Sequence, residues 1–393
     1  MPHPLIRLLP KQDRRLKSGH PWAFSNEIAM TPDHRTWPRG APVRIEGDDG
    51  WRFGTFMFNP HSLIGGRLLD RDPDAAIDDA WVRARLADAV LLRARVTPGA
   101  HHRLVHAEAD RLPGLIIDRF GDVAVVQANT AGMDRLLPGI TAALLDLLPL
   151  RAIVGRNDSA ARLHEGLPQH VGLLHGTDAV AVADEGGVRF PVDPLAGQKT
   201  GFFWDQRLNR DRVAALADGA RVLDVFCHTG AFGLRAAAAG ASEVLLVDSS
   251  QPALDQALLA AGVNGLADRI AVQRGDAFDV MGALGAAHET FDIVVCDPPA
   301  FAKSRKDQDA GLRAYHRMTR LAAPLVRPGG FLFVASCSHH APLDQFTAQV
   351  ASALLRAKRE ARIVQTGTAG PDHPVHPGLP ESAYLKSLLL QLS

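Results

Sequence analysis

Cysteine is scarce in this chain, which has three among 393 residues, at positions 227, 296 and 337. An odd number of cysteines in one region of a long chain argues against a disulfide-stapled extracellular domain and favours a reducing compartment. No two of them have the short spacing of a zinc-binding pair. The sequence therefore predicts neither a disulfide framework nor a metal site.

An excess of charge and a long apolar run are also lacking. Lysine plus arginine and aspartate plus glutamate number 43 each, so the net charge gives no argument for a nucleic-acid partner, and any such surface must come from local clusters of cations. No segment offers 18 consecutive apolar residues, and the amino terminus has no long apolar run. We expect a cytoplasmic protein without a signal peptide, a membrane span or a membrane partner.

The length suggests two or three domains. Residues 1–72 read as short strands and turns, at 43–45, 54–58 and 63–69, and predict a small β-barrel. Its cations Lys11, Arg14 and Lys17 precede His20-Pro-Trp-Ala-Phe24. Cations beside aromatic rings suit phosphates and exposed bases, although Trp22 and Phe24 could equally be packing residues of the barrel.

Residues 73–185 predict an α+β linking domain. A helix is expected at 80–94, because apolar residues recur there at three- and four-residue steps. Strands at 103–108, 114–119 and 122–128, a helix near 133–147 and a strand at 152–155 follow. The Asp184-Glu-Gly-Gly187 turn marks the expected boundary with residues 186–393.

Strands and helices alternate after residue 222, which predicts a doubly wound α/β sheet with ligands beyond the carboxyl ends of its strands. The expected strands lie at 222–225, 243–247, 270–273, 291–296 and 331–336, and the helices at 231–239, 251–262 and near 308–326. The apolar segment 384–392 is expected to add a strand at the edge of this sheet.

The turn after the first of these strands favours S-adenosylmethionine over a dinucleotide. A dinucleotide turn needs glycines where this chain has Phe226 and His228, and only Gly230 and Gly233 remain. A cofactor without phosphate tolerates a bulkier loop. Asp224, which ends the strand, would face the ammonium and sulfonium groups of such a cofactor.

Two further aspartates follow the next two strands. Asp248 is placed to accept hydrogen bonds from ribose hydroxyls, and Asp276 to hold the adenine amino group. Each of the three acids alone could be a loop or helix cap. Three acids at three successive strand ends favour a cofactor site, and the further cofactor contacts expected there are Phe226, Gly230, Ser249 and Ala277.

The segment Cys296-Asp-Pro-Pro-Ala-Phe301 predicts a strand that ends rigidly on an acid. The two prolines cannot continue a ladder, so Asp297 should stand at the tip and hold a base beside the methyl group. The following run Lys303-Ser-Arg-Lys306 would meet RNA phosphates, or form a solvated loop.

The next strand delivers Cys337 to the same edge. Carbon 5 of cytosine becomes nucleophilic only after addition at carbon 6, and a thiolate suits that addition. Buried packing is the better interpretation for Cys296 and stays open for Cys227. The loop 197–210, with Lys199, Phe202, Phe203, Asp205 and Arg207, could cover the cofactor and steer the base.

Taken together these motifs resemble the RlmI-like class of ribosomal RNA large-subunit cytosine-5 methyltransferases. The likeness covers nearly the whole chain, through His20–Phe24, Glu108–Leu115, Ile117–Gly121, Gly197–Arg210, Asp224–Gly230, Asp297–Phe301 and Ser336–Ser338. It implies a PUA RNA-binding domain at 1–72, a linking domain at 73–185 and a class I methyltransferase domain at 186–393. It assigns the nucleophile to Cys337, the base-contacting acid to Asp297 and the cofactor acids to Asp224, Asp248 and Asp276.

The resemblance implies methylation of carbon 5 of a cytosine in 23S ribosomal RNA through a covalent Cys337 adduct. The candidate RNA contacts are Lys11, Arg14, Lys17, Lys199, Arg207 and Lys303. The Asp-Pro-Pro-x-Phe motif is also similar to that of a guanine-N7 methyltransferase, so N-methylation of a purine without covalent catalysis is the alternative. A ribosome-assembly factor that keeps the fold without the reaction is a third hypothesis, and a homodimer is an open alternative to a monomer.

Overall fold

The computed structural model describes residues 3–197 and 200–393. Within that range the chain forms two compact units. The first unit contains residues 3–183, 192–197, 200–204 and 371–382, and the second contains residues 184–191, 205–370 and 383–393. The three-domain division at 72 and 185 stays a prediction. No helix in the described range is long and apolar enough to cross a membrane.

A small five-stranded sheet opens the first unit. Its elements are β1 (Leu5–Arg7), α1 (Arg14–Lys17), β2 (Trp22–Ala23), β3 (Ala41–Glu46), β4 (Arg52–Phe58) and β5 (Gly66–Asp70). The strand order is β1-β3-β4-β5-β2, with β1 and β3 parallel and the other neighbours antiparallel. In β3, Val43 and Ile45 are fully buried and the intervening Arg44 is only partly buried, as expected for a strand with one face on a core. In β4 every residue from Phe53 to Phe58 is buried, so both faces of this strand are covered.

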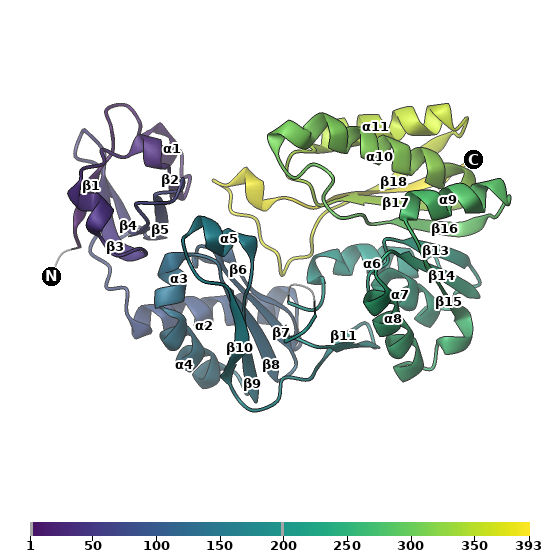
Figure 1. The fold of residues 1–393 in the computed structure, drawn as a ribbon, viewed down its shortest axis with the longest axis horizontal. Helices are drawn as coiled ribbons and strands as arrows, with labels where there is room; N and C mark the ends of the chain where they lie inside the picture. Colours follow the sequence, from purple (N-terminus) through teal and green to yellow (C-terminus); the bar gives the residue numbers. More distant parts are fainter. Residues whose placement is uncertain (1–2, 198–199) are drawn as a thin grey trace. The chain divides into compact units, whose positions relative to one another are not determined.

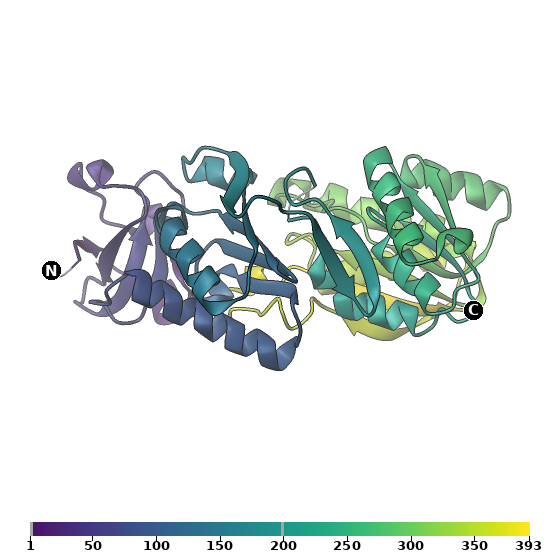
Figure 2. The same ribbon diagram turned by 90° about the horizontal axis from the view of Figure 1, so that it is seen from below.

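A second five-stranded sheet follows in the same unit, in the order β10-β9-β8-β7-β6. Its elements are α2 (Asp79–Val96), β6 (His101–His106), β7 (Leu115–Phe120), β8 (Val123–Ala128), α3 (Ala131–Arg135), α4 (Leu137–Leu147), β9 (Ala152–Asn157), α5 (Ala160–His164) and β10 (His170–His175). Helices α2 and α4 pack on each other and on one face of the sheet (Figure 2). The Asp78 carboxylate caps α2 by accepting from the Trp81 N–H at 2.9 Å, which explains where this helix begins.

The segment 371–382 also belongs to the first unit, although it lies near the far end of the sequence. The buried guanidinium of Arg93 makes two hydrogen bonds with the Asp110 carboxylate, of 2.6 and 2.7 Å, and donates a third to the Asp372 carbonyl at 3.0 Å. The Asp372 carboxylate in turn accepts from the Arg103 N–H at 3.1 Å. A buried arginine has to be paired, and these bonds hold the segment in place.

The second unit is built on a seven-stranded sheet in the order β15-β14-β13-β16-β17-β19-β18. Its strands are β13 (Arg221–Val225), β14 (Glu243–Asp248), β15 (Ile270–Arg274), β16 (Phe291–Cys296), β17 (Val326–Ser336), β18 (Ala361–Gly367) and β19 (Lys386–Leu392). The first five are parallel, and β19 pairs antiparallel with both neighbours. The order reverses between β13 and β16, and such a switch point is where doubly wound sheets bind ligands.

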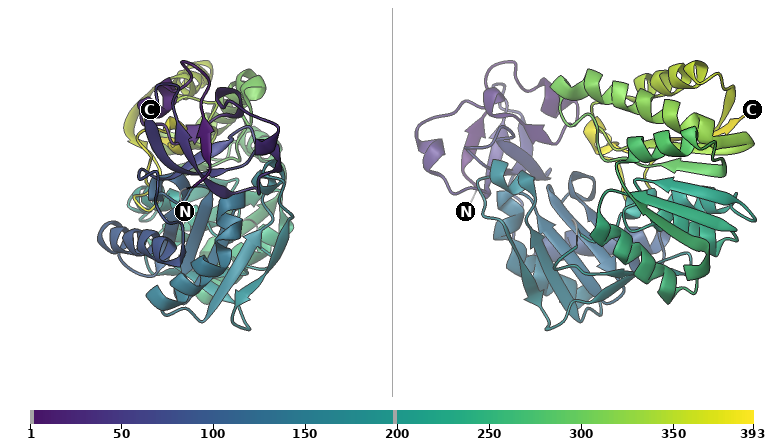
Figure 3. Two further views of the ribbon diagram at one scale, coloured as in Figure 1. Left: turned by 90° about the vertical axis from the view of Figure 1, so that its left-hand side faces the viewer. Right: turned by 45° about the vertical axis from the view of Figure 1, so that its right-hand side comes forward.

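Helices cover both faces of this sheet, as Figure 1 and the right-hand view of Figure 3 show. On one face lie α6 (Arg207–Ala214), α7 (Ala231–Ala238) and α8 (Gln251–Val263), and on the other lie α9 (Ala277–Ala286), α10 (Gln308–Ala322) and α11 (Leu343–Arg356). A separate two-stranded sheet is formed by β11 (Ala181–Glu185) and β12 (Val188–Val192). The expected doubly wound architecture is thereby confirmed.

One expectation about this sheet is wrong. The segment near the end of the sequence was expected to be an added edge, but β19 lies between β17 and β18, and β18 is the edge strand. The reason is visible in the burial: Leu388, Leu389 and Leu390 are all buried, as a central strand requires. The exposed β18 has no such apolar run, and neither it nor α9 and α11 was expected from the sequence.

Candidate active site

The turn between β13 and α7, which we call the cofactor turn, holds two residues other than glycine in a backbone conformation that favours glycine. Phe226 and His228 have φ of 62° and 51°, in the left-handed region that favours glycine. Such residues cost on the order of 1 kcal/mol each and persist where the surrounding structure fixes them. Gly230, with φ of 74°, caps the helix that follows. Phe226 and Gly230, two expected cofactor contacts, therefore lie on this turn.

Asp224 lies beneath that turn. Its side chain is 1 % exposed, and its Oδ2 accepts a hydrogen bond of 2.9 Å from the Gly233 N–H in the first turn of α7. Burial, with the nearby carboxylates of Asp297 and Asp248, raises the pKa of the Asp224 carboxyl to about 8. A buried carboxyl with so high a pKa is suited to a cationic ligand, whose charge would favour the ionised form.

Asp248 and Asp276 end the next two strands of the sheet, as the sequence indicates. The Asp248 carboxylate accepts from the backbone N–H groups of His228 and Ser250, at 2.9 and 2.8 Å, and so ties the cofactor turn to the end of β14. Asp276 caps α9, because its Oδ1 accepts from the N–H groups of Phe278 and Asp279. The capping interpretation is therefore correct for Asp276, and its Oδ2 lies outside the cap.

Aromatic rings connect the cofactor turn to the end of β16. Phe226, Phe278 and Phe301 have their ring centres 6.0 to 6.1 Å apart from one another. The Phe301 ring also lies 4.9 Å from that of Tyr315. The expected contact Ala277 is buried next to this cluster, and Ser249 is exposed beyond β14. An apolar, aromatic wall of this kind suits a flat adenine ring.

Asp297 stands directly after β16 and is held by a chain of polar side chains. Its Oδ1 accepts a hydrogen bond of 2.8 Å from Nε2 of Gln206, a residue that is 3 % exposed. The Gln206 Oε1 accepts from Asn209 Nδ2 at 2.5 Å, and the Asn209 Oδ1 accepts from Ser387 Oγ at 3.1 Å. Because three elements contribute to the chain, the orientation of the Asp297 carboxylate is fixed.

Cys337 lies at the neighbouring strand end. β17 pairs in parallel with β16, and the Cys337 Sγ is 3.9 Å from the Pro298 carbonyl oxygen. Cys337 is partly exposed, whereas Cys227 and Cys296 are buried. Burial raises the pKa of both buried thiols well above its usual value, so neither is suited to be a nucleophile.

The residues around Cys337 form a buried hydrogen-bond network. The Tyr315 hydroxyl lies 2.9 Å from Ser336 Oγ and 2.8 Å from Ser338 Oγ, and Ser338 Oγ accepts from the Ala302 N–H. The Lys386 ammonium donates to the carbonyls of Ser338 and Ala341 at 2.6 and 2.9 Å. Burial lowers the pKa of Lys386, and the charge of Cys337 opposes that shift. The turn that carries the thiol is therefore rigid and close to a buried cation.

The predicted RNA contacts occupy different surroundings. Lys11, Arg14 and Lys303 are exposed, and Arg207 is half-buried at the start of α6. The Lys17 ammonium lies 2.6 Å from the Asp13 carboxylate and 2.8 Å from that of Asp49, which raises the pKa of Lys17. Lys199 lies outside the described residues.

The aromatic residues beside the first basic cluster have defined partners. The Trp22 Nε1 donates to the Glu108 carboxylate at 2.8 Å, which also pairs with Arg67, and the Arg15 guanidinium lies 4.6 Å from the centre of the Phe24 ring. Trp22 therefore links the small sheet to the loop after β6, within the first unit.

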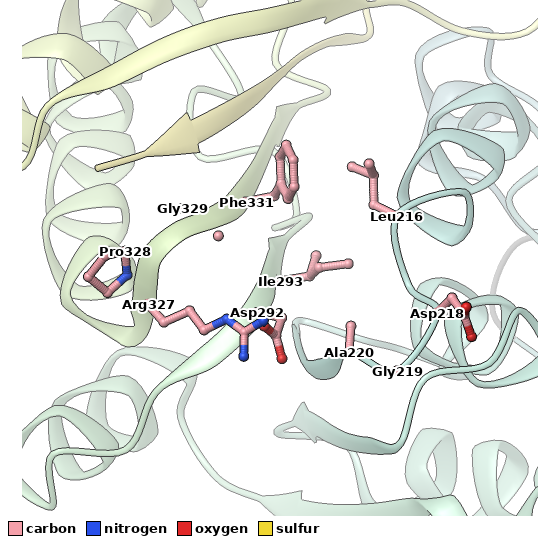
Figure 4. Close-up of a pocket in the computed structure, with 11 residues that line it drawn as sticks. Leu216, Asp218, Gly219, Ala220, Asp292, Ile293, Arg327, Pro328, Gly329 and Phe331 are labelled. Carbon is pink, nitrogen blue, oxygen red and sulfur yellow. The ribbon is translucent and has the colours of Figure 1, made fainter.

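A pocket in the second unit lies at the opposite ends of these strands. It is lined by the start of β16, by the Arg327–Phe331 segment of β17 and by the loop before β13 (Figure 4). Arg327 forms an ion pair with Asp292 there. Ligands of doubly wound sheets bind at the carboxyl ends of the strands, so this pocket is not the cofactor site.

The sequence predicts Asp297 and Cys337 at adjacent strand ends, where the structure places them, but it does not predict the residues that hold them. Gln206 and Asn209 lie just before and within α6, and neither carries a charge or belongs to a motif that indicates a functional role. Lys386 and Ser387 come from β19. The one available signal was a lysine in an apolar strand, since a buried lysine requires partners.

Comparison with known proteins agrees with this geometry. A model of the S-adenosylmethionine-dependent methyltransferase family matches residues 156–391, and one of a PUA-like domain matches residues 6–71. The proteins named ribosomal RNA large subunit methyltransferase I from Shewanella amazonensis and Aeromonas hydrophila are each 36% identical to this chain. These alignments cover 98% of this chain and 99% and 98% of the relatives.

Solved structures show the same fold. A SAM-dependent methyltransferase from Streptococcus mutans superposes with a TM-score of 0.83 at 20% identity, over 99% of this chain and 100% of that one. The methyltransferase SMU.776, solved in complex with SAH, has a TM-score of 0.83 at 21% identity over 100% of both chains. The expected PUA-like domain, methyltransferase fold and S-adenosylmethionine cofactor are confirmed. By sequence, fold and the form of its cofactor turn, the chain belongs to the S-adenosylmethionine-dependent methyltransferase family, in the group of the ribosomal RNA large subunit methyltransferase I proteins.

Proposed function

We propose that this methyltransferase acts on large-subunit ribosomal RNA and methylates carbon 5 of a cytosine in the 23S molecule. The names of its relatives, which are 36% identical over nearly their whole length, support ribosomal RNA as the substrate. A ribosomal substrate agrees with the expected cytoplasmic location. The observation that carries the cytosine chemistry is that Cys337, alone among the three cysteines, is partly exposed and lies beside Asp297 at the ends of two adjacent strands.

Cofactor binding is assigned to the strand ends of β13, β14 and β15. The Asp224 carboxylate, with its raised pKa, would face the cationic part of the cofactor. Asp248 would accept from the ribose hydroxyls, Asp276 would hold the adenine amino group, and Phe226 and Ala277 would contact the ring. Gly230 and Ser249 complete the set. The bound cofactor supplies an electrophilic methyl group.

The reaction begins when the target cytosine leaves its stack and enters the site. A free cysteine has a pKa of about 8.5, so the Cys337 thiol must lose its proton before it attacks. The thiolate adds to carbon 6 and forms a carbon–sulfur bond, while Asp297 hydrogen-bonds the edge of the base and favours the addition. Carbon 5 then takes the methyl group. Loss of the carbon 5 proton to a base and cleavage of the carbon–sulfur bond release the product and the thiolate.

The candidate RNA contacts divide between the two units. Lys11, Arg14 and Lys17 belong to the PUA-like part and Arg207 and Lys303 to the methyltransferase part, and we propose that they bind phosphates. Lys17 is the weakest of these candidates, because two carboxylates already neutralise it.

The test is transfer of labelled methyl from S-adenosylmethionine to unmodified 23S ribosomal RNA, followed by identification of the nucleoside. We expect 5-methylcytidine from the wild type, none from Cys337→Ala, and unchanged binding of S-adenosylhomocysteine by that variant. Cys296→Ala is the matched control and should keep its activity, because Cys296 is buried packing. A methylated purine that survives Cys337→Ala would establish the N-methyltransferase alternative instead.

A second readout tests the covalent step directly. RNA that carries 5-fluorocytosine at the target position lacks the carbon 5 proton whose loss releases the enzyme. The wild type should therefore form a stable protein–RNA adduct that survives denaturation, and Cys337→Ala should form none. An adduct mapped to another residue would reject Cys337 as the nucleophile.

A further inference from the structure

The exposed side of α10 carries a row of arginines that the proposed reaction does not use. Arg313, Arg317 and Arg320 are spaced by four and three residues, which places them on one face of a helix. All three are exposed, whereas Leu312, Tyr315 and the other residues of the opposite face are buried in the core of the second unit. The charges of this row are therefore needed neither for packing of the core nor for the proposed reaction.

We propose that this row binds the phosphate backbone of the RNA whose target base enters the active site. We name the α10 basic face for the exposed residues Lys303, Arg305, Lys306, Arg313, Arg317, Arg320 and Arg356. The proposal rests on the proposed RNA substrate and identifies the surface that holds the strand next to the reacting base.

The charge of this face is a local excess in a neutral chain. Residues 303–320 contain six lysines and arginines and two aspartates, a net charge of about +4, although the whole chain balances 43 against 43. His316, on the same helix, has a lowered pKa, caused by burial and by the charges of Arg356 and Arg320. The α11 residue Arg356 is therefore close to the row and widens it.

These cations have no acidic partner in the described part of the chain. Among the described residues, 3–197 and 200–393, no member of the α10 basic face forms an ion pair. Buried arginines such as Arg93 and Arg210, by contrast, each pair with a carboxylate. The Arg317 guanidinium lies 4.6 Å from the centre of the Phe278 ring, which fixes its position without neutralising its charge. A cluster of unneutralised guanidinium groups suits an extended polyanion.

Helix α10, which carries the row of arginines, packs tightly on the loop that follows Asp297. A Cβ on Gly311 would lie only 2.7 Å from the backbone nitrogen of Ala302, so the first turns of α10 and the loop after Asp297 are in direct contact. On the same side Tyr315 contacts Phe301 and both serines that flank Cys337. The position of the α10 basic face is thus fixed relative to the nucleophile.

The dimensions fit a single strand. From Arg313 to Arg320 the helix rises about 10 Å, a length over which a nucleic-acid strand in a helical stack presents about three phosphates. One strand could therefore follow the row while its flipped base occupies the site. An acidic protein partner would be an alternative occupant of a basic helix, and the experiment distinguishes the two.

The experiment compares Arg313→Glu/Arg320→Glu with Arg212→Glu/Arg362→Glu. The first pair leaves Arg317 on Phe278 and so spares the neighbourhood of the cofactor; the second is a matched control on α6 and β18, whose residues are also exposed. Binding of a labelled fragment of unmodified large-subunit ribosomal RNA is measured at several salt concentrations, and S-adenosylhomocysteine binding is measured by calorimetry.

We expect the α10 variant to bind RNA at least about tenfold more weakly, with a log–log salt slope that is shallower by about 1.5, since each lost phosphate contact removes roughly 0.7 to 0.9. Binding of S-adenosylhomocysteine should be unchanged, which also shows that the unit is folded. The charge-preserving Arg313→Lys/Arg320→Lys variant should restore most of the RNA affinity. The control pair should resemble the wild type.

An α10 variant that binds RNA with the affinity and salt slope of the wild type would overturn the proposal, and so would an equal loss in the control pair. Because binding is read without methyl transfer, the result is independent of the chemistry. If the wild type produces a methylated purine and the α10 variant binds RNA more weakly, this proposal stands and the cytosine mechanism is rejected. If the α10 variant forms 5-methylcytidine normally and its KM for RNA is unchanged, the cytosine mechanism stands and the proposed RNA surface on α10 is rejected.

Discussion

The Lys386 ammonium donates a hydrogen bond of 2.6 Å to the carbonyl oxygen of Ser338, the residue that follows the proposed nucleophile. A second bond of 2.9 Å reaches the Ala341 carbonyl. Lys386 is 8 % exposed, so its ammonium group is kept in the interior, close to the Cys337 thiol. The buried carbonyl groups of Ser338 and Ala341 each accept a hydrogen bond from it.

Lys386→Met should weaken both the fold and the thiolate. Methionine keeps the length of the chain but leaves two buried carbonyls without a donor, which costs on the order of 1 to 3 kcal/mol for each group. Loss of the nearby cation should also slow alkylation of Cys337 at pH 7, measured by mass spectrometry of the folded protein. Lys358→Met, at an exposed lysine after α11, is the control. Equal alkylation rates in both variants would show that Lys386 only supports the fold.

Asp297→Asn should lower kcat by about 10² or more, because a positioned carboxylate that acts in the transition state is worth that much. Binding of S-adenosylhomocysteine should not change. Gln206→Leu keeps the Asp297 carboxylate but removes the hydrogen bond that orients it, together with the bond from Asn209. The loss of the orienting bond is worth about 1 to 1.5 kcal/mol and should lower kcat about tenfold. Gln365→Leu on β18 controls for loss of a glutamine. A Gln206 variant with full activity would remove the orienting role.

The raised pKa of Asp224 predicts a pH-dependent stability of the protein without cofactor. The pKa is 3.8 in the unfolded chain and about 8 in the folded state, so the folded state binds the proton more tightly. This contribution to the free energy of unfolding is complete below pH 4 and is lost as the pH rises through about 8, at up to about 1.4 kcal/mol per pH unit.

Urea unfolding of the wild type and of Asp224→Asn, at pH 6, 7 and 8, measures this contribution. The asparagine can still accept from the Gly233 N–H but cannot ionise. Its free energy of unfolding should therefore fall less steeply with pH than that of the wild type, while other titrating groups affect both proteins alike. Parallel pH profiles would mean that Asp224 is not protonated in the folded protein.

Gly233→Ala should disturb the cofactor turn. A Cβ at this position would lie 2.3 Å from Leu246 Cδ2 and 2.8 Å from Val244 Cγ1, so α7 would have to move away from β14. We expect a loss of about 1 to 3 kcal/mol in the free energy of unfolding and weaker S-adenosylhomocysteine binding.

Gly262→Ala in α8 is its control. A Cβ there meets nothing within 4 Å, and alanine is the better helix former by about 1 kcal/mol. This variant should therefore be slightly more stable than the wild type, with normal cofactor binding. A Gly233 variant that behaves in the same way would show that the close approach of α7 to β14 is not required.

Local pattern was enough to predict most of the seven-stranded sheet and the adjacent positions of Asp297 and Cys337 at its strand ends. Two prolines, Pro298 and Pro299, follow the strand that ends at Cys296 and fix its end. Alternation of strands and helices places the carboxyl ends of all parallel strands at one edge of the sheet. Asp297 and Cys337 could therefore be predicted to lie close together without a structure. The positions of Asp224, Asp248 and Asp276 followed from the same rule. Their backbone hydrogen bonds did not, because they depend on the conformation of the turn.

Long-range pairing could not be predicted in the same way. Nothing local in residues 386–392 indicates that this strand inserts between β17 and β18, since an apolar run fits an edge or a central position until its neighbours are known. Gln206, Asn209, Lys386 and Ser387 reach the site only through that pairing and through the packing of α6. The role of a neutral side chain such as Gln206 can be recognised only when the structure shows the acid to which it donates a hydrogen bond.

The central position of β19 has a consequence for how the protein is made. Ser336 and Lys386 are direct neighbours across the sheet, but fifty residues of synthesis separate them. A nascent chain that has already formed β13 to β17 holds Asp297 and Cys337, while their supports, Lys386 and Ser387, have not yet been translated. We therefore expect the edge that carries Asp297 and Cys337 to be completed last, because the sheet stays open at β17 until residues 386–392 are inserted, and we expect activity only after this region has been synthesised.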